Sequence, residues 1–129
     1  MKARTIYPGK VKGKAIVSKE PISFYGGIDM KTGIVIEKGH EIEGKCIKNK
    51  IFVFPYAKGS TVGSYVIYGL KKNNVAPLAI INKETETIVA TGSILAGIVC
   101  VDGIDIEKIR NGSIVEIVAE EKEAEVMVK

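Results

Sequence analysis

The stretch IFVFPYAKGSTVGSYVIYGLKKNNVAPLAII, residues 51–81, decides the fold class of this chain. It begins with a continuous apolar run over residues 51–54 that ends at Pro55, which is typical of a strand buried on both faces. Apolar residues then recur at positions 62, 65, 66, 69 and 70, the spacing of an amphipathic helix. A second apolar run at residues 78–81 predicts another buried strand. The order strand, helix, strand indicates an α/β domain.

The expected helix has recognisable ends. Ser60 or Thr61 can serve as its N-cap, because a short hydroxyl side chain accepts a hydrogen bond from a free N–H group of the first turn. The basic pair at residues 71–72, followed by Asn73 and Asn74, is a C-terminal signal. We therefore expect the helix to begin just after this hydroxyl pair and to end near Asn73.

Shorter elements flank this central unit. Charged and apolar residues alternate at the start of residues 10–17, which predicts a half-buried strand. Residues 20–33 carry Pro21, several glycines, Phe24 and Tyr25, and indicate a long loop with aromatic anchors, a kind of segment that often carries function. The remaining expected elements are strands at 34–36, 44–47, 98–101, 113–118 and 125–128, a helix or turn at 87–97, and a short helix at 104–110.

Length and composition favour one strand-rich domain. A chain of 129 residues is one domain by the usual prior of roughly 100–200 residues. It contains 20 isoleucines and 14 valines but three leucines, and β-branched residues suit a pleated surface. We therefore expect a single β-rich α/β domain over residues 1–129. An open sheet of this kind would bind its ligand at the carboxyl ends of its strands, where the loop at residues 58–64 lies.

Charge and hydrophobicity exclude several classes of partner. The net charge of +4 is spread along the chain, and the basic runs at 48–50 and 71–72 lack the interleaved aromatics of a nucleic-acid groove. No segment reaches the roughly 20 apolar residues that cross a bilayer, and no signal-peptide pattern opens the chain. We expect a cytoplasmic protein in which Cys46 and Cys100 are buried thiols rather than a disulfide.

The loop at residues 58–64 is the candidate site. Gly59 and Gly63 allow positive φ and close backbone approach, and free N–H groups at a helix start favour a carboxylate or phosphate. The hydroxyls of Ser60, Thr61 and Ser64 cluster there beside Lys58. The same residues also fit an ordinary capped helix start, and they match neither a Walker A loop nor a nucleophile elbow.

No metal site is expected within this chain. His40 is its single histidine and lies in a polar turn, where a surface or loop-fixing role is commoner than metal binding. No second histidine and no spaced cysteine pair supports a zinc site.

Several segments together resemble a known family. EPISFYGGID at residues 20–29, Thr32-Gly33, His40 and KGSTVGS at residues 58–64 are similar to the swivel-domain small subunit of the aconitase X family. The resemblance implies a swivelling β/β/α domain that pairs with a larger catalytic subunit in a dehydratase. Archaeal members convert (R)-5-phosphomevalonate to trans-anhydromevalonate 5-phosphate in isoprenoid synthesis, whereas bacterial relatives dehydrate cis-3-hydroxy-L-proline. It also implies a [4Fe-4S] cluster held by the large subunit, with none bound by this chain.

The resemblance also assigns residues. Ser60 matches the serine that accepts the substrate proton. The loop around it would bind the phosphorylated hydroxy-acid substrate through Lys58, Gly59, Thr61, Gly63 and Ser64. In the loop at residues 20–29, Gly26 and Gly27 would approach the cleft closely, and Asp29 would fix the loop or face the partner. Alternatively, Phe24 and Tyr25 simply anchor this loop to the core. Lys58 stands where arginine is common, and lysine keeps the charge but loses the planar fork. Thr61 stands where serine is common.

The helix N-terminus alone cannot make the Ser60 hydroxyl a usable base. A helix N-terminus supplies at most about 2 kcal/mol, which is roughly 1.5 pKa units, and a hydroxyl titrates far above neutral pH. The rest must come from the partner, the substrate and the exclusion of water. We therefore expect the isolated chain to be inert.

Two other functions fit parts of the sequence. The run at residues 90–101 resembles the helix-then-strand of phosphohistidine swivel domains, but Thr91 and Ser93 stand where that function needs a histidine. A non-catalytic small-anion module could use the same loop. A free-standing small chain with this Lys- and Glu-rich, archaeal-looking composition favours phosphomevalonate over hydroxyproline as substrate.

Overall fold

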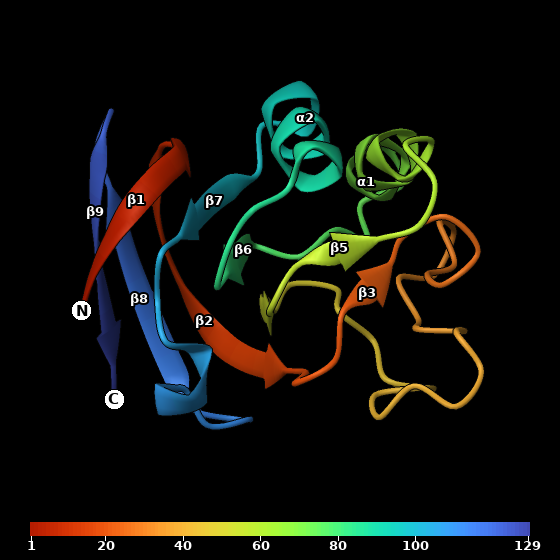
Figure 1. The fold of residues 1–129 in the computed structure, drawn as a ribbon, viewed down its shortest axis with the longest axis horizontal. Helices are drawn as coiled ribbons and strands as arrows, with labels where there is room; N and C mark the ends of the chain where they lie inside the picture. The colour runs from red at the N-terminus through yellow and green to blue at the C-terminus, as the bar shows by residue number, and fades with distance from the viewer.

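Strands dominate the fold, which the computed structural model describes over all of residues 1–129. The fold is β-rich α/β, as the composition predicts (Figure 1). In chain order the elements are β1 Lys2–Tyr7, β2 Gly9–Val17, β3 Ile22–Ser23, β4 Ile51–Phe54, β5 Ala57–Lys58, α1 Gly63–Lys72, β6 Ala79–Asn82, α2 Thr87–Ala96, β7 Val99–Asp102, the 3-10 helix η1 Ile106–Lys108, β8 Ile114–Ala119 and β9 Glu123–Val128.

Seven strands form a closed barrel in the order β1-β7-β6-β4-β2-β8-β9. Strands β2, β4, β6 and β7 run parallel, and the remaining pairs are antiparallel. The expected open sheet is therefore wrong. The sequence pattern does not predict strand β1. This strand pairs with β7 on one side and with β9 on the other, and the double pairing closes the barrel.

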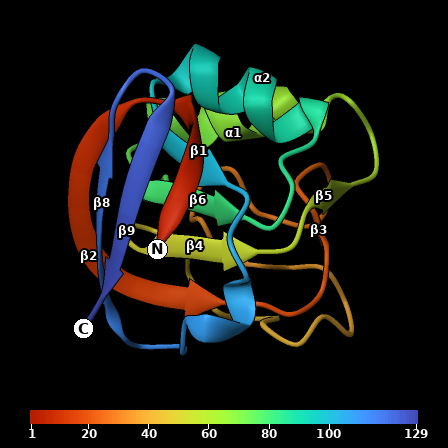
Figure 2. The same ribbon diagram turned by 60° about the vertical axis from the view of Figure 1, so that its left-hand side comes forward.

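The helices and the small sheet lie outside the barrel. Helices α1 and α2 pack against each other over one side of it, as Figure 2 shows at the top. Strands β3 and β5 form a separate parallel pair in which Ser23 lies opposite Lys58. This pair leads directly into the candidate loop.

Several local expectations change. The strands expected at 34–36 and 44–47 are reduced to single bridges, Ile28 to Val35 and Ile34 to Cys46, and the helix expected at 104–110 is one 3-10 turn. The N-cap of α1 is Val62, whose side chain makes no cap hydrogen bond, so neither Ser60 nor Thr61 occupies that position. The C-terminal signal is confirmed, since Asn73 is the C-cap after Lys71 and Lys72.

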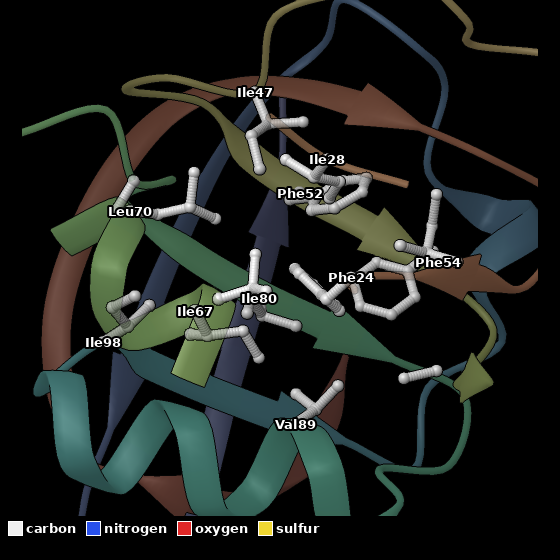
Figure 3. Packing of buried hydrophobic residues seen from close by; sticks show 14 of the residues in the cluster. Phe24, Ile28, Ile47, Phe52, Phe54, Ile67, Leu70, Ile80, Val89 and Ile98 are labelled. Carbon is white, nitrogen blue, oxygen red and sulfur yellow. The ribbon is translucent and has the colours of Figure 1, made fainter. Parts of the chain in front are cut away.

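An aromatic trio anchors the long loop to the barrel. Phe24 packs edge-on against Phe52 and Phe54 of β4, with ring centroids 6.3 and 5.8 Å away. All three side chains are fully buried beside Ile67 of α1 and Ile80 of β6 (Figure 3). The loop at residues 20–33 is therefore fixed to the core at Phe24, next to its two adjacent glycines.

A buried carboxylate joins β1 to the end of β7. Asp102 is 2% exposed and accepts hydrogen bonds from Nε and Nη2 of Arg4, at 2.9 and 2.8 Å, and from the N–H of Thr85 at 2.7 Å. Burial alone would raise the pKa of Asp102, but the hydrogen bonds and charge of Arg4, with the bond from Thr85, hold it below its ordinary value. The ionised form is therefore the one that stabilises the fold.

We expect this group to contribute to acid sensitivity. Because the folded-state pKa of Asp102 is depressed, its contribution is present above the unfolded value of about 3.9 and is lost as pH falls through the folded value. Urea unfolding at a series of pH values should show a steeper loss of stability below about pH 4 in the wild type than in Asp102→Asn. Equal slopes in the two proteins would show that Asp102 does not contribute to the acid sensitivity of the fold.

Candidate functional site

Ser60 lies at the surface, in the turn between β5 and α1. Gly59 turns the chain out of β5 with φ of 90°, and α1 begins three residues after Ser60. The Oγ atom of Ser60 accepts the N–H of Val62 at 3.2 Å, and its carbonyl oxygen accepts the N–H of Gly63 at 3.0 Å. The Ser60 side chain is exposed rather than packed beneath its neighbours. Its hydroxyl group can therefore reach a molecule that approaches this turn.

The free donors of this turn lie before the helix, not in its first turn. The N–H groups of residues 62–65 all donate within the turn, to Ser60 Oγ and to the carbonyl oxygens of Ser60, Thr61 and Val62. This corrects the expectation of unpaired N–H groups at the helix start. The backbone N–H groups of Ser60 and Thr61 donate to no group of the chain and remain available to an anion.

Lys58 is held by an acidic residue that the sequence analysis did not single out. Its Nζ lies 2.9 Å from Oε2 of Glu37, whose other oxygen accepts the N–H of Ser23 at 3.1 Å. Burial alone would raise the pKa of Glu37, but the hydrogen bond from Lys58, the bond from Ser23 and the Lys58 charge together lower it. The hydrogen bond to Glu37 raises the pKa of Lys58. Glu37 therefore ties the end of β5 to β3.

A shallow hollow of about 340 Å³ opens beside this ion pair. It is lined by Ser23, Tyr25, Gly26, Gly27, Glu37, Lys58 and Gly59. Ser60 follows Gly59 directly in the sequence but is not itself among the lining residues. The structure thus brings the EPISFYGGID loop and the KGSTVGS loop together, which the sequence could suggest only through the resemblance.

The glycines of these two loops have different roles. Gly26 has φ of 80° and open space around it, whereas a Cβ on Gly27 would lie 1.9 Å from the carbonyl oxygen of Ser23. A Cβ on Gly63 would lie 3.0 Å from Cγ2 of Ile88 and 3.3 Å from Cβ of Phe24. Gly63 thus serves close packing of α1 and does not adopt positive φ. Gly27 is required for the tight turn that shapes the hollow.

The other expected site residues do not line the hollow. Ser64 is 6% exposed, and its hydroxyl donates to the carbonyl oxygen of Thr61 at 3.0 Å, whereas the Thr61 side chain is exposed. The Oδ1 atom of Asp29 accepts the N–H of Lys31 at 2.9 Å, and its backbone carbonyl oxygen accepts the N–H of Gly33 at 2.8 Å, so Asp29 stabilises its own loop. Asp29 does not line the hollow.

His40 holds the start of the long loop in place. It is 5% exposed; Nε2 lies 3.0 Å from the carbonyl oxygen of Pro21, and Nδ1 accepts the N–H of Ile42 at 3.3 Å. The loop-fixing role of this histidine is therefore confirmed, while a surface position is wrong.

Neither cysteine forms a disulfide. Cys100 is buried, and burial raises the pKa of its thiol to about 12, whereas Cys46 is only half-buried. No group of three or more His, Cys, Asp or Glu side chains is placed to hold a metal ion. Neither helix is long and apolar enough to span a membrane.

Comparison with known proteins gives a consistent result. The family model described as the aconitase X swivel domain matches residues 1–126. The phosphomevalonate dehydratase small subunit of Thermococcus sibiricus is 56% identical over 126 residues, covering 98% of this chain and 97% of the relative. That of Methanosarcina acetivorans is 52% identical, covering 91% and 83%. A crystal structure of Thermococcus kodakaraensis aconitase X (holo-form) matches with a TM-score of 0.92 and 53% identity, over 98% of both chains.

Proposed function

The chain belongs to the aconitase X swivel-domain family, and from this premise we propose that it is the small subunit of a hydro-lyase acting on (R)-5-phosphomevalonate. The product would be trans-anhydromevalonate 5-phosphate, and the protein would act in the cytoplasm. The observation that carries this proposal is the near-full-length similarity, at 52–56% identity, to chains named phosphomevalonate dehydratase small subunit. Such a name implies a larger partner subunit.

In the proposed reaction, Ser60 accepts the proton on the carbon next to the substrate carboxylate. The electron pair of that C–H bond forms the C=C bond, and the C–O bond at the neighbouring carbon breaks. The departing hydroxide takes a proton from an acid group that the partner would supply and leaves as water. The exposed Ser60 hydroxyl, in the turn directly after the lining residue Gly59, supports this role. Because a serine hydroxyl is a weak base at neutral pH, the step requires a closed, water-excluding site around it.

The acid half of the reaction is assigned to the partner. A departing hydroxyl needs a Lewis acid, and the three-ligand groups that bind metal ions do not occur in this chain. The larger subunit would hold the [4Fe-4S] cluster that supplies this chemistry. This chain would contribute the base and part of the anion site.

The substrate's anionic groups would meet Lys58 and the free N–H groups of Ser60 and Thr61. Lys58 is about half exposed while Glu37 holds it, so its charge faces the hollow without being buried. Gly59 and Gly63 would shape the loop, and Ser64 would hold its turn from beneath. We propose that Gly26 and Gly27 line the cleft and that Asp29 supports their loop.

Reconstitution tests the proposal. The chain and the large subunit from the same genome are purified anaerobically. Their mixture and each subunit alone are then incubated with (R)-5-phosphomevalonate or with cis-3-hydroxy-L-proline. We expect dehydration of phosphomevalonate by the mixture and none by either subunit. Turnover of hydroxyproline alone would reassign the substrate. No turnover of either substrate by a stable complex would favour a non-catalytic anion-binding module.

A further inference from the structure

We propose that this chain binds a diphosphate group in a second hollow, which we call the basic hollow. The volume of the basic hollow is about 670 Å³, and it shares no lining residue with the hollow beside Lys58. Figure 2 shows its place, since η1 and the end of β2 lie together below the barrel, whereas α1 and α2 lie above it. No residue of the loop at 58–64 lines the basic hollow, so binding there is independent of the proposed dehydration.

Hydrogen bonds hold the walls of the basic hollow in place. The walls come from the end of β2, from the long loop between β3 and β4, and from η1 with the turn that follows it. In that turn, Oδ1 of Asn111 accepts the N–H of Val17 at 3.0 Å. In the long loop, the carboxylate of Glu41 accepts the N–H of Lys19. Small-molecule sites are usually largely formed before the ligand arrives, and these bonds between segments give the basic hollow that property.

Most of the net positive charge of the chain is concentrated around the basic hollow. Five cationic and two acidic side chains line it, a net charge of +3, whereas the whole chain carries +4. The rest of the molecule is therefore almost neutral. Clefts lined by one sign of charge focus the electric field and attract ligands of the opposite sign. The five cations are Lys14, Lys19, Lys45, Lys50 and Arg110.

These five cations are not neutralised by carboxylates of the chain. All four ion pairs of the structure involve other residues. Lys50 is only partly exposed, while the other four cations are exposed. Like charges that line one hollow repel one another, and a bound anion would replace this repulsion with attraction. The charge of the basic hollow is therefore available to a ligand.

The remaining lining of the basic hollow favours a small molecule over a nucleic acid. The apolar side chains of Ile16, Ile42 and Ile109 line it and are 7%, 7% and 3% exposed. An apolar lining with a few charged groups, in a volume between about 300 and 1,000 Å³, is typical of a small-molecule site. None of the 15 lining residues is aromatic, so the stacking platform that binds nucleic-acid bases is absent.

The net charge of the basic hollow selects a diphosphate group. A lysine ammonium group binds phosphate as a point charge, and a phosphate monoester carries about −1.5 to −2 at pH 7. A single phosphate group would leave about one positive charge unmatched, which a second phosphoryl group matches. Free pyrophosphate and organic diphosphates both carry this group. The organic part of the latter would also cover the apolar lining.

Two matched pairs of substitutions test the proposal. Lys14→Gln with Lys45→Gln removes two charges from two walls of the basic hollow. Lys71→Gln with Lys72→Gln removes two charges from the end of α1, outside the basic hollow. All four side chains are exposed and form no ion pair, so both variants should stay folded, which thermal unfolding checks. Calorimetry at low ionic strength measures the Kd of the full chain for pyrophosphate.

We expect pyrophosphate to bind at one site, and Lys14→Gln with Lys45→Gln to raise its Kd about tenfold or more, because two charge-assisted contacts are lost. The pair at Lys71 and Lys72 should change the Kd by no more than about twofold, since those charges act only through a screened field. Lys14→Arg with Lys45→Arg keeps both charges and should bind within about threefold of the wild type. Equal losses from both glutamine pairs, or no binding by the wild type, would overturn the site.

A second ligand distinguishes the two sources of the diphosphate group. Hexyl diphosphate carries the same charged group on an alkyl chain. If the ligand is an organic diphosphate, hexyl diphosphate should bind at least about fivefold more tightly than pyrophosphate, because its alkyl chain is removed from water against the apolar lining. Equal affinities would identify free pyrophosphate as the ligand of the same site.

The same measurement on the complex with the large subunit tests whether the basic hollow stays open in the assembled protein. The comparison between the two glutamine pairs cancels any pyrophosphate that binds beside Ser60, because neither pair lies in the loop at residues 58–64. We expect the difference of about tenfold between the two pairs to persist in the complex. Its disappearance would overturn the proposal, because the cations would then serve the contact between subunits.

Discussion

Ser60→Ala is expected to lower kcat of the reconstituted dehydratase by about 10²–10⁴-fold, the contribution of a positioned general base. The alanine keeps the backbone N–H groups of this turn, so KM should change little. The fold should also survive, because the side-chain hydrogen bond that is lost, to the N–H of Val62, lies at the surface, where water can replace it. Steady-state kinetics of the purified complex gives both quantities.

Thr61→Ala is the matched control for this prediction. It removes the neighbouring exposed hydroxyl group, which neither donates nor accepts a hydrogen bond within the chain. We expect kcat within about tenfold of the wild type, since a group outside proton transfer contributes less than a general base. A Ser60→Ala complex that turns over as fast as Thr61→Ala would reduce Ser60 to a residue that shapes the helix entry.

Phe24→Ala should reduce the free energy of unfolding by about 3–5 kcal/mol, the usual cost of truncating a buried phenylalanine. Phe24 is 1% exposed and packs against Phe52 and Phe54, so its removal leaves a cavity beside β4. The loop with Gly26 and Gly27 would also lose its anchor, and binding of the large subunit should weaken. Denaturant unfolding measures the first effect.

Tyr25→Ala removes an exposed aromatic side chain from the same loop and so serves as the control for the buried Phe24. Tyr25 is 58% exposed, so its removal should change stability by no more than about 0.5 kcal/mol. A loss comparable with that of Phe24→Ala would mean that the loop depends on its surface tyrosine. The account of the aromatic anchor would then be wrong.

Local patterns were sufficient to predict the centre of the fold. The apolar runs at β4 and β6 and the periodic residues of α1 depend on neighbours in the sequence, so periodicity finds them. Strand β1 is short and carries Lys2 and Arg4, and its two partners are distant in the sequence: Arg4 pairs with Asp102 of β7 and with Glu123 of β9. Closure of the barrel is therefore a long-range property that local patterns miss.

Glycine conformation explains the strands that were expected but do not form. Gly33, Gly39 and Gly44 all have φ between 74° and 83°, which interrupts the extended backbone on either side of residues 34–36. Val35 is 1% exposed and packs in the core, although its pairing is reduced to a single bridge to Ile28.

The candidate site was predictable only in part. Gly59, Ser60 and Gly63 were indicated by the loop between strand and helix, and the resemblance to aconitase X added the second loop at residues 20–29. Glu37 was missed because a glutamate in a polar turn carries no local signal, and its partner Lys58 lies 21 positions further along the chain. The parallel pairing of β3 with β5 places Ser23 beside Lys58, and Glu37 bonds to both residues.

Hydrogen exchange at the substrate carbon tests the central claim most directly. The complex is incubated with (R)-5-phosphomevalonate in D₂O, and NMR follows deuterium entering the carbon next to the carboxylate as the reversible reaction proceeds. We predict exchange by the wild-type complex and at least a 100-fold slower rate with Ser60→Ala, at equal substrate occupancy. Undiminished exchange in the Ser60→Ala complex would show that another group takes the proton.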